Sequence, residues 1–520
     1  MAKDTAIGHK PKPQKAVVLL LDSLNRHMLG CYGGKEFETP NLDRLAARSL
    51  VFNRHYTGSL PCMPARHDIL VGSLDFLWRP WGSIELWERP ITYGLRRKDI
   101  VSMLISDHPH LFETGGENYH TDFFAWEYLR GHESDPWKTR EDPSGLGTPA
   151  LPAGHQRAYG KTRKGYDLSR TWFREEAEYP GPKTMQAAAD WLRDNGQHHD
   201  SFLLFVDEFD PHEPFDTPLP WARKYDPDWK EDLIIWPPYS ADAIGSGALT
   251  ERQASHVRAN YGAKLSMIDH WLGKVLDEMD RQNLWEDTAL FLCTDHGHYL
   301  GEKGIFGKPR VPQYETLGRI PLMVAWPGLP HREVEALTTS VDIHASLVDL
   351  FDLEIDHVTH GHSLLPLIQG RVDKVRDWVV GGVFGQWIQI ESEDIKYARA
   401  PVNKGFPLSM WSNRWSTMPV PGIPGLRLPN PDKRAWLDFM PGSEIPVIRQ
   451  PFQEGDLLPF WSINPPLEEH HLYKLSVDPQ ELENLAGKDR RLERRMENLL
   501  IEALGELKAP GEQLERLGLG

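Results

Sequence analysis

Cysteine is scarce in this chain, which has only Cys31, Cys62 and Cys293 among its 520 residues. An odd number this small cannot form the dense disulfide framework of a small secreted protein, and it is typical of a reducing compartment. Residues 1–15 are polar and contain no apolar run of the length that a signal peptide requires. We therefore expect a cytoplasmic protein.

Long hydrophobic runs and excess basic charge are also missing. No stretch approaches the roughly 20 apolar residues of a membrane span, so no membrane partner is expected. The chain has 58 basic and 75 acidic residues, for a net charge of -17, which argues against nucleic acid as a partner. We find no internal repeat and no glycine-rich nucleotide loop. A local cationic pocket can still bind a small anionic substrate.

The length and composition predict two packed units. A chain of 520 residues exceeds one ordinary hydrophobic core, and 40% hydrophobic with 26% charged residues is typical of a globular protein. Near residue 377 the composition changes to short apolar runs broken by many prolines, glycines and tryptophans. We predict a catalytic domain over 1–376 and a smaller α+β domain over 377–520.

The periodicity of apolar residues predicts an α/β fold. Unbroken runs at 17–21, 201–206 and 289–293 indicate strands buried on both faces of a parallel sheet. Helical spacing extends from 252 to 283. Residues 377–463 favour a small antiparallel sheet. The charged helix expected at 488–507 can dock on its own chain or on a second copy, as in a homo-oligomer.

Several predicted strands end in residues that can bind metals or move protons. Asp22 follows the run at 17–21, and Asp295 and His296 follow the run at 289–293. The strand expected at 100–105 leads to His108 and His110. Because parallel strands end at one edge of a sheet, we expect these side chains to share a site. For each histidine, the plain alternative is a hydrogen-bonded loop residue.

Cys62 lies in the stretch 61–66, which reads Pro-Cys-Met-Pro-Ala-Arg. Pro64 removes a backbone donor and biases Met63 away from helix, which predicts a turn between a strand and a helix. The apolar run at 69–71 supplies that helix. An isolated cysteine is usually a small buried hydrophobic residue, but this flanking pattern favours a functional cysteine.

The pattern Cys62-x-Pro64-x-Arg66 resembles the signature of type I, formylglycine-dependent sulfatases of the alkaline phosphatase superfamily. Ala65 stands where the family usually has serine. Three further blocks follow in the family's order: Thr39 to Ala46; Thr294 to Gly297 with Gly301-Glu302 and Gly307-Lys308; and Leu472 to Leu475 with Asp478-Pro479 and Glu483 to Ala486. The resemblance implies a large mixed, mostly parallel sheet flanked by helices.

The resemblance also implies a modified residue and a metal. Cys62 would be oxidised to formylglycine (3-oxoalanine) by a formylglycine-generating enzyme. Asp22, Asp295, His296 and an oxygen on residue 62 would hold one divalent cation. Hard oxygen ligands with one imidazole favour Ca²⁺ or Mn²⁺, and they favour Mg²⁺ less.

Roles for the remaining site residues follow from the same resemblance. Arg66 would orient the hydrated formylglycine, whose oxygen attacks sulfur to give a covalent sulfate ester. His212, between Pro211 and Pro214, would protonate the leaving alcohol together with Lys308, and both would bind substrate. His110 would deprotonate the second hydroxyl so that sulfate is expelled. His108 would also contact substrate, at a position where the family usually has lysine.

The function predicted is an arylsulfatase-like hydrolase of sulfate monoesters. Ser23 stands where many members of the family carry a second aspartate, and relatives that cleave phosphonate monoesters and phosphodiesters also lack that second acid. A phosphonate monoester hydrolase is therefore the alternative, and promiscuity between the two esters is expected. A pseudoenzyme that binds anions without oxidation of Cys62 is a second alternative. Loops at 76–90 and 131–182 would select the alcohol half of the substrate.

Overall fold

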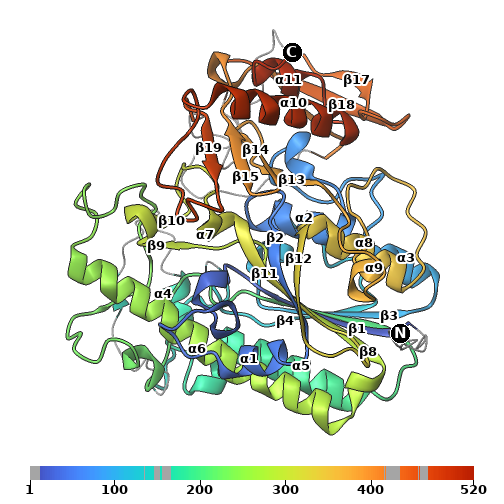
Figure 1. Ribbon diagram of the computed structural model, residues 1–520. Helices are drawn as coiled ribbons and strands as arrows, with labels where there is room; N and C mark the ends of the chain where they lie inside the picture. Colours follow the sequence, from blue (N-terminus) through green and yellow to red (C-terminus); the bar gives the residue numbers. More distant parts are fainter. Residues whose placement is uncertain are drawn as a thin grey trace, which may run out of the picture.

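The computed structural model describes residues 12–133, 135–145, 153–154, 165–414, 416, 434–454, 456 and 467–520 (Figure 1). Its centre is an eight-stranded sheet. The strands are β1 (Lys15–Leu21), β2 (Leu50–Tyr56), β3 (Val101–Ser106), β4 (Ala125–Tyr128), β6 (Phe202–Glu208), β8 (Thr288–Cys293), β11 (Arg319–Ala325) and β12 (Arg332–Thr339). Their order across the sheet is β12-β2-β11-β8-β1-β6-β3-β4.

The sheet is mixed and mostly parallel. β1 pairs in parallel with β6 and β8, β3 pairs in parallel with β6 and β4, and β12 pairs in parallel with β2. Only β11 runs against its neighbours β2 and β8 within this sheet. The predicted fold class is confirmed.

Helices cover both faces of the sheet (Figure 1). One face carries α1 (Pro40–Ala46), α5 (Pro180–Asn195) and α6 (Glu251–Arg281), and the other carries α2 (Cys62–Val71), α3 (Ile91–Arg97), α8 (Ser340–Leu350) and α9 (Leu365–Ile368). Alternate residues of β1 enter two separate hydrophobic clusters, Val17, Leu19 and Leu21 in one and Ala16, Val18 and Leu20 in the other. This burial on both faces explains the unbroken apolar run.

Helix α6 confirms the helical spacing read from 252 to 283. Its start is fixed by a capping box, because the hydroxyl of Thr250 accepts from the backbone N–H of Gln253 at 3.2 Å and the Gln253 side chain accepts in return at 2.9 Å. Helix α5 begins at Pro180, earlier than its apolar residues predict, because proline fits the first helical turn.

Helix α2 carries Cys62 as its first residue. The expectation that Pro64 keeps Met63 out of the helix is wrong, because both lie in the first turn, where a missing N–H breaks no intrahelical bond. The helix ends at Gly72, whose φ of 84° is left-handed. A Cβ there would lie 2.3 Å from Nδ1 of His344, so glycine is required for this close approach.

The C-terminal part forms two antiparallel sheets where one was predicted. The first has β13 (Trp378–Gly382), β14 (Ile388–Ser392), β15 (Ile395–Arg399) and β19 (His471–Lys474), and the second has β16 (Leu408–Ser412), β17 (Trp436–Phe439) and β18 (Pro446–Phe452). β13 also bonds to the stretch before Cys62, where Leu60 N donates to Gly382 O at 3.0 Å. The division of the chain at 376 stays a prediction.

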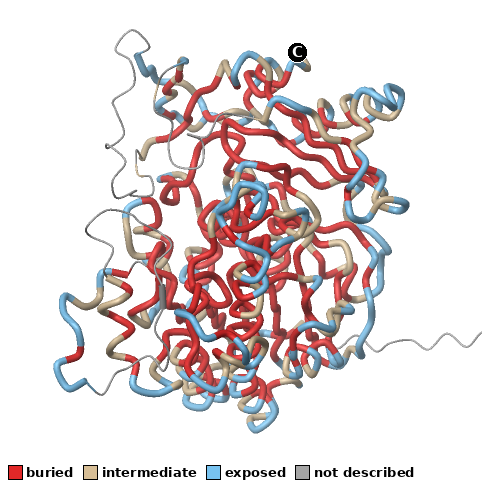
Figure 2. Tube along the Cα trace, turned by 90° about the vertical axis from the view of Figure 1, so that its left-hand side faces the viewer, coloured by how far each residue is buried: buried red, intermediate tan, exposed pale blue. Residues whose placement is uncertain are grey.

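Two helices, α10 (Arg490–Glu506) and α11 (Glu512–Arg516), cover these sheets (Figure 1). The apolar side of α10 packs into the chain's own core through Met496, Leu500, Ala503 and Leu504. Figure 2 shows that buried segments fill the interior and exposed segments lie at the periphery. Within the described ranges, none of the helices combines the length and apolar character that a bilayer span needs.

Shorter elements complete the part near the site. The pair β9 (Tyr299–Leu300) and β10 (Phe306–Gly307) precedes Lys308, and α7 (Glu315–Gly318) leads into β11. The predicted irregular insertion at 131–182 falls partly outside the described residues. Its described part includes β5 (Ala153–Gly154), which pairs with β7 (Leu233–Ile234), and the short helix α4 (Gly165–Arg170).

Candidate active site

Four side chains that can bind a metal meet at the carboxyl edge of the central sheet. Asp22 follows β1, Asp295 and His296 follow β8, and Cys62 opens α2. One donor atom from each residue lies within 4.8 Å of the donor atoms of the others, and all four residues are buried. The structure thus brings together the residues that the sequence assigns to the metal.

The donor set fits a divalent cation, since it offers two carboxylates and one imidazole around residue 62. The Sγ of Cys62 lies 3.2 Å from Nε2 of His296. Oδ2 of Asp22 is buried and accepts no hydrogen bond from a described residue, although it forms an ion pair with Arg66. Burial and the neighbouring charge of Asp295 raise the pKa of Asp22, and a cation between the two carboxylates would relieve this cost.

Arg66 lies behind the four clustered side chains, one helical turn after Cys62. Its Nη1 donates to Oδ2 of Asp295 at 2.8 Å and to the carbonyl of Cys62 at 3.2 Å. Its Nη2 lies 3.0 Å from Oδ2 of Asp22. The opposite edge of the guanidinium is bound by Asp207. Arg66 therefore holds the start of α2 and both carboxylates in one arrangement.

Ser23 acts on the same carboxylates through hydrogen bonds. Its hydroxyl donates to Oδ1 of Asp22 at 2.8 Å, and its backbone N–H donates to Oδ1 of Asp295 at 3.0 Å. Its φ of 61° is left-handed. Ser23 thus orients Asp22 and Asp295 and adds no negative charge.

Lys308 and His212 form the second half of the site. His212 donates from Nδ1 to the carbonyl of Glu213 at 2.7 Å, so Nε2 is free to accept from Lys308 Nζ at 2.9 Å. Lys308 Nζ also lies 3.9 Å from the Sγ of Cys62. Burial lowers the pKa of His212, whereas acidic neighbours raise the pKa of Lys308 despite its burial. At neutral pH the positive charge of the Lys308–His212 pair is therefore on Lys308.

His110 lies between two carboxylates. Its Nδ1 pairs with Glu113, and its Nε2 lies 3.3 Å from Oε2 of Glu133. Burial alone would lower its pKa, but Glu113 and Glu133 raise the pKa of His110 to about 10. The ring of Trp81 packs edge-on against it, with centroids 5.1 Å apart. His110 is therefore positively charged at neutral pH.

His108 has the opposite environment. It is buried, its Nε2 lies 3.7 Å from Oδ2 of Asp22, and neither ring nitrogen has a hydrogen-bond partner among the described residues. Burial and the charge of Arg66 lower the pKa of His108. The neutral ring does not replace the charge of a lysine at this position, and the nearby positive charge belongs to His110.

The sequence interpretation missed the acidic partners of these residues. Asp207 is the last but one residue of the buried strand β6 and follows an unbroken apolar run, as Asp22 does, so its place near the sheet edge was a usable signal. Glu213 lies between His212 and Pro214 and could also have been noticed. Glu113 and Glu133 follow no strand, and no signal in the sequence pointed to them.

Comparison with known proteins identifies the family. The sequence profile of the sulfatase family matches residues 14–353. A choline-sulfatase from Rhizobium meliloti is 26% identical over 384 residues, covering 68% of this chain and 71% of that protein. A multifunctional alkaline phosphatase superfamily protein from Trinickia caryophylli is 26% identical over 407 residues, covering 68% and 75%.

Solved structures show the same fold. The phosphonate monoester hydrolase of Agrobacterium radiobacter superposes with a TM-score of 0.62 over 96% of both chains, at 18% identity. Because the family profile covers well over half of the chain, the protein belongs to the sulfatase family and is a sulfuric ester hydrolase with an alkaline phosphatase-type fold.

Proposed function

We propose that this protein hydrolyses sulfate monoesters of small molecules, using formylglycine at position 62 and one divalent cation. The observation that carries the proposal is the buried cluster of Asp22, Cys62, Asp295 and His296, with the ammonium group of Lys308 beside it. A sulfate ester is an anion that repels nucleophiles, so its hydrolysis needs positive charge near the attacked sulfur.

The position of each residue indicates its role in the proposed reaction. Asp22, Asp295 and His296 would hold the cation, which, together with the hydrated aldehyde of residue 62, supplies a nucleophile at neutral pH. Arg66 fixes residue 62 through its carbonyl. Lys308 lies close enough to Cys62 to bind an ester oxygen at the reacting sulfur.

The proton for the leaving alcohol would come from the Lys308–His212 pair. In the resting arrangement Lys308 donates to Nε2 of His212, so Nε2 can take up a proton from Lys308 and deliver it from the same nitrogen to the departing oxygen. Esters of poorly acidic alcohols depend most on this transfer, because their leaving oxygens carry the most charge.

His110 would accept the proton that leaves the second hydroxyl when sulfate is expelled. Since Glu113 and Glu133 contact its two nitrogens and favour the protonated ring, His110 must first lose a proton before it can act as this base. His108, a neutral ring beside Asp22, would contact the substrate without adding charge.

Hydrolysis of phosphonate monoesters is the second candidate, favoured by one observation. Ser23 occupies a place beside Asp22 and Asp295 and contributes hydrogen bonds without a carboxylate. A site with one negative charge fewer tolerates the greater charge of a phosphoryl transition state. We propose sulfate as the better substrate and phosphonate as a measurable second activity.

The test compares esters that share one leaving group. Protein matured with a formylglycine-generating enzyme is assayed with an aryl sulfate and the matching aryl phosphonate, and the modified fraction is measured by peptide mass spectrometry. We expect the higher kcat/KM for the sulfate. A tenfold preference for the phosphonate, equal to about 1.4 kcal/mol of transition-state binding, would establish the second candidate instead.

A further inference from the structure

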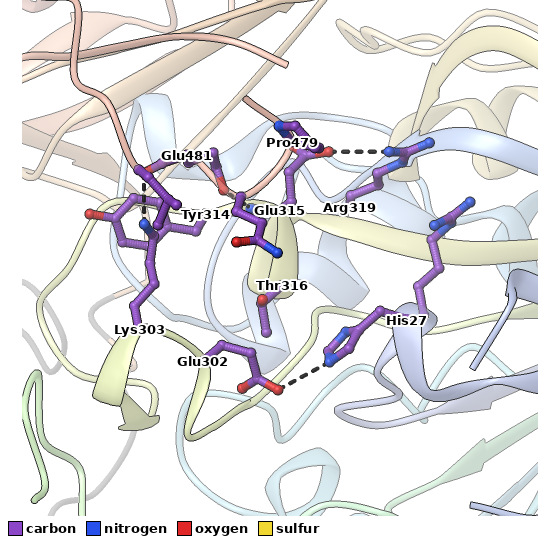
Figure 3. Close-up of a pocket in the computed structure, with 12 residues that line it drawn as sticks. His27, Glu302, Lys303, Tyr314, Glu315, Thr316, Arg319, Pro479 and Glu481 are labelled. Carbon is purple, nitrogen blue, oxygen red and sulfur yellow. Dashed lines mark hydrogen bonds and ion pairs between the residues drawn. The ribbon is translucent and has the colours of Figure 1, made fainter. Parts of the chain in front are cut away.

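A pocket of about 540 Å³ opens next to the catalytic part and contains none of the proposed catalytic residues (Figure 3). Its walls come from residues 26 and 27 in the 3-10 helix η1 (Arg26–Met28), from residues 302 and 303, from residues 314–316 with Arg319, and from residues 479–482. Thr316 forms part of the wall, and the next residue, Leu317, accepts from the backbone N–H of Gly297 at 2.9 Å. The wall of the pocket is therefore continuous with the backbone that is hydrogen-bonded to Gly297, the residue after His296.

Each acidic residue of the pocket already has a cationic partner. Glu302 pairs with Arg258 at 2.6 Å and with His27 at 3.1 Å. Glu315 and Glu481 share Lys396, at 2.6 and 2.9 Å. These ion pairs reduce the negative charge that faces the pocket.

Arg26 is a cation without such compensation. Its guanidinium lies over the ring of Tyr32 at 4.2 Å, and Nη2 donates to Oδ1 of Asn53 at 3.2 Å. Its Nε is buried and has no hydrogen-bond partner among the described residues, which also give Arg26 no ion pair. A buried N–H without an acceptor is costly and indicates a missing ligand.

Arg319 adds a second guanidinium at the same end of the pocket. It donates from Nε to the carbonyl of Asn53 at 2.7 Å, and its Nη1 is 3.5 Å from Oε2 of Glu315. Burial and the positive charge of Arg319 lower the pKa of Arg26, which means that the two guanidiniums repel each other. An anion between them would offset this repulsion.

We propose that the Arg26–Arg319 end of this pocket binds an oxyanion of the sulfate or phosphate type. Guanidinium groups suit such anions because their N–H groups form a planar fork toward paired oxygens. Figure 3 shows Arg319 at one end of the pocket and Lys303 at the other. Lys303 donates to the carbonyl of Glu481 at 2.7 Å and lies over the ring of Tyr314, so it serves as an internal comparison.

The experiment titrates the full-length chain with inorganic sulfate and, separately, with inorganic phosphate by calorimetry. A Lys308→Ala background weakens anion binding at the catalytic site, so that the remaining binding reports on the pocket. Adding Arg26→Gln should weaken this binding at least tenfold. Adding Lys303→Gln removes the same charge at the far end and should leave it within twofold. The anion with the lower Kd, sulfate or phosphate, is the preferred ligand.

The folding of each variant is checked by its thermal melting curve. If Arg26→Gln unfolds, Arg26→Lys provides a second test, because lysine keeps the positive charge and lacks the planar guanidinium. Anion binding by Arg26→Lys should still weaken severalfold. Titrations that are the same with and without the Arg26 substitutions would overturn the proposal. Equal losses in Arg26→Gln and Lys303→Gln would also overturn it, since they would indicate a general charge effect.

Discussion

Arg66 and Asp207 form a two-point ion pair in the interior of the protein. Nε of Arg66 lies 2.8 Å from Oδ2 of Asp207, and Nη2 lies 2.7 Å from Oδ1. The free edge of the guanidinium reaches Asp295, a proposed metal ligand, at 2.8 Å. Asp207 therefore determines how much of the Arg66 charge acts on the metal-binding carboxylates.

Substitution of Asp207 should affect both stability and metal binding. Asp207→Ala leaves a buried guanidinium undercompensated, so the free energy of unfolding in urea should fall by about 3–5 kcal/mol. Asp207→Asn keeps the shape of the side chain and removes its charge. Arg66 then interacts more strongly with Asp22 and Asp295, so the affinity for divalent metal, measured by chelator competition, should fall.

The exposed pair between Arg44 and Asp277 gives the control for this experiment. Asp277→Asn should change stability by less than about 1 kcal/mol. Equal stability losses in Asp277→Asn and Asp207→Ala, or unchanged metal affinity in Asp207→Asn, would contradict this role for Asp207.

Asp295→Ala should remove metal and activity together. The substitution deletes one of two carboxylates in the donor cluster, so the loss should exceed the ~10–100-fold cost of removing an outer-sphere partner. Elemental analysis of the purified variant measures the metal, and steady-state kinetics measure the activity. One metal per chain with near-normal turnover would show that Asp295 is structural.

Cys62→Ser should abolish multiple turnover while the metal remains bound. A serine supplies one hydroxyl, so a transferred sulfuryl group has no second hydroxyl to expel it, and the variant should stop after one reaction. Intact-protein mass spectrometry would detect the added group. Full activity in protein whose Cys62 remains a thiol would contradict the formylglycine assignment.

His67 should make stability depend on pH. It is buried, with Nε2 2.9 Å from Oε2 of Glu88, and although burial opposes it, Asp75 and Glu88 raise the pKa of His67 to about 9. Because this value lies above the unfolded pKa of about 6.5, the stabilisation is complete below pH 6.5 and is lost as pH rises to 9. The loss should be about 3 kcal/mol, on the scale of about 1.4 kcal/mol per unit of pKa shift.

The measurement is urea unfolding at several pH values between 6.5 and 9. In His67→Gln the slope of stability against pH should become flatter than in the unsubstituted protein. The exposed residue His198 offers a matched substitution, and His198→Gln should leave the slope unchanged. A slope that is the same in His67→Gln and His198→Gln would refute the charge on His67.

The sheet was predictable where its strands are buried on both faces. β1 and β8 carry unbroken apolar runs because helices cover both faces, and the residues that follow them, Asp22 and Asp295, are brought together by the topology. Strand β2, nearer the edge of the sheet between β12 and β11, was harder to predict because its pattern includes the polar residues Asn53 and Arg54, which are only partly buried.

The partners of the site residues were less predictable, for a physical reason. Arg66 follows Cys62 by one helical turn, so local geometry alone brings it to the Cys62 carbonyl. Glu113 and Glu133 reach His110 through loop conformations that no periodicity describes. The charge of His110 is therefore a property of the tertiary structure.

The Glu113–His110 contact predicts a shift in the pH dependence of turnover. If His110 acts as the base, the rising limb of kcat should follow its deprotonation, and Glu113→Gln removes a carboxylate that raises its pKa. The limb should then move to lower pH by about one unit, equivalent to about 1.4 kcal/mol. Glu127→Gln, at an exposed position, should leave the limb in place. An unmoved limb in Glu113→Gln would assign the base to another group.

Ser23 offers a direct test of the balance between sulfate and phosphonate. Ser23→Asp adds a carboxylate to a fully buried position beside Asp22 and Asp295, and aspartate tolerates the left-handed backbone there better than most residues. The added charge should tighten metal binding and make the metal less electropositive. A phosphoryl transition state carries more negative charge than a sulfuryl one, so phosphonate turnover should suffer more.

We expect the ratio of kcat/KM for phosphonate over sulfate to fall about tenfold in Ser23→Asp, equivalent to about 1.4 kcal/mol of differential transition-state binding. Ser23→Asn matches the size of the new side chain without its charge and should change the ratio by less than about threefold. The two esters share a leaving group, so differences in alcohol release cancel in the ratio. If Asn and Asp change the ratio equally, shape at position 23 controls the preference and the charge argument fails.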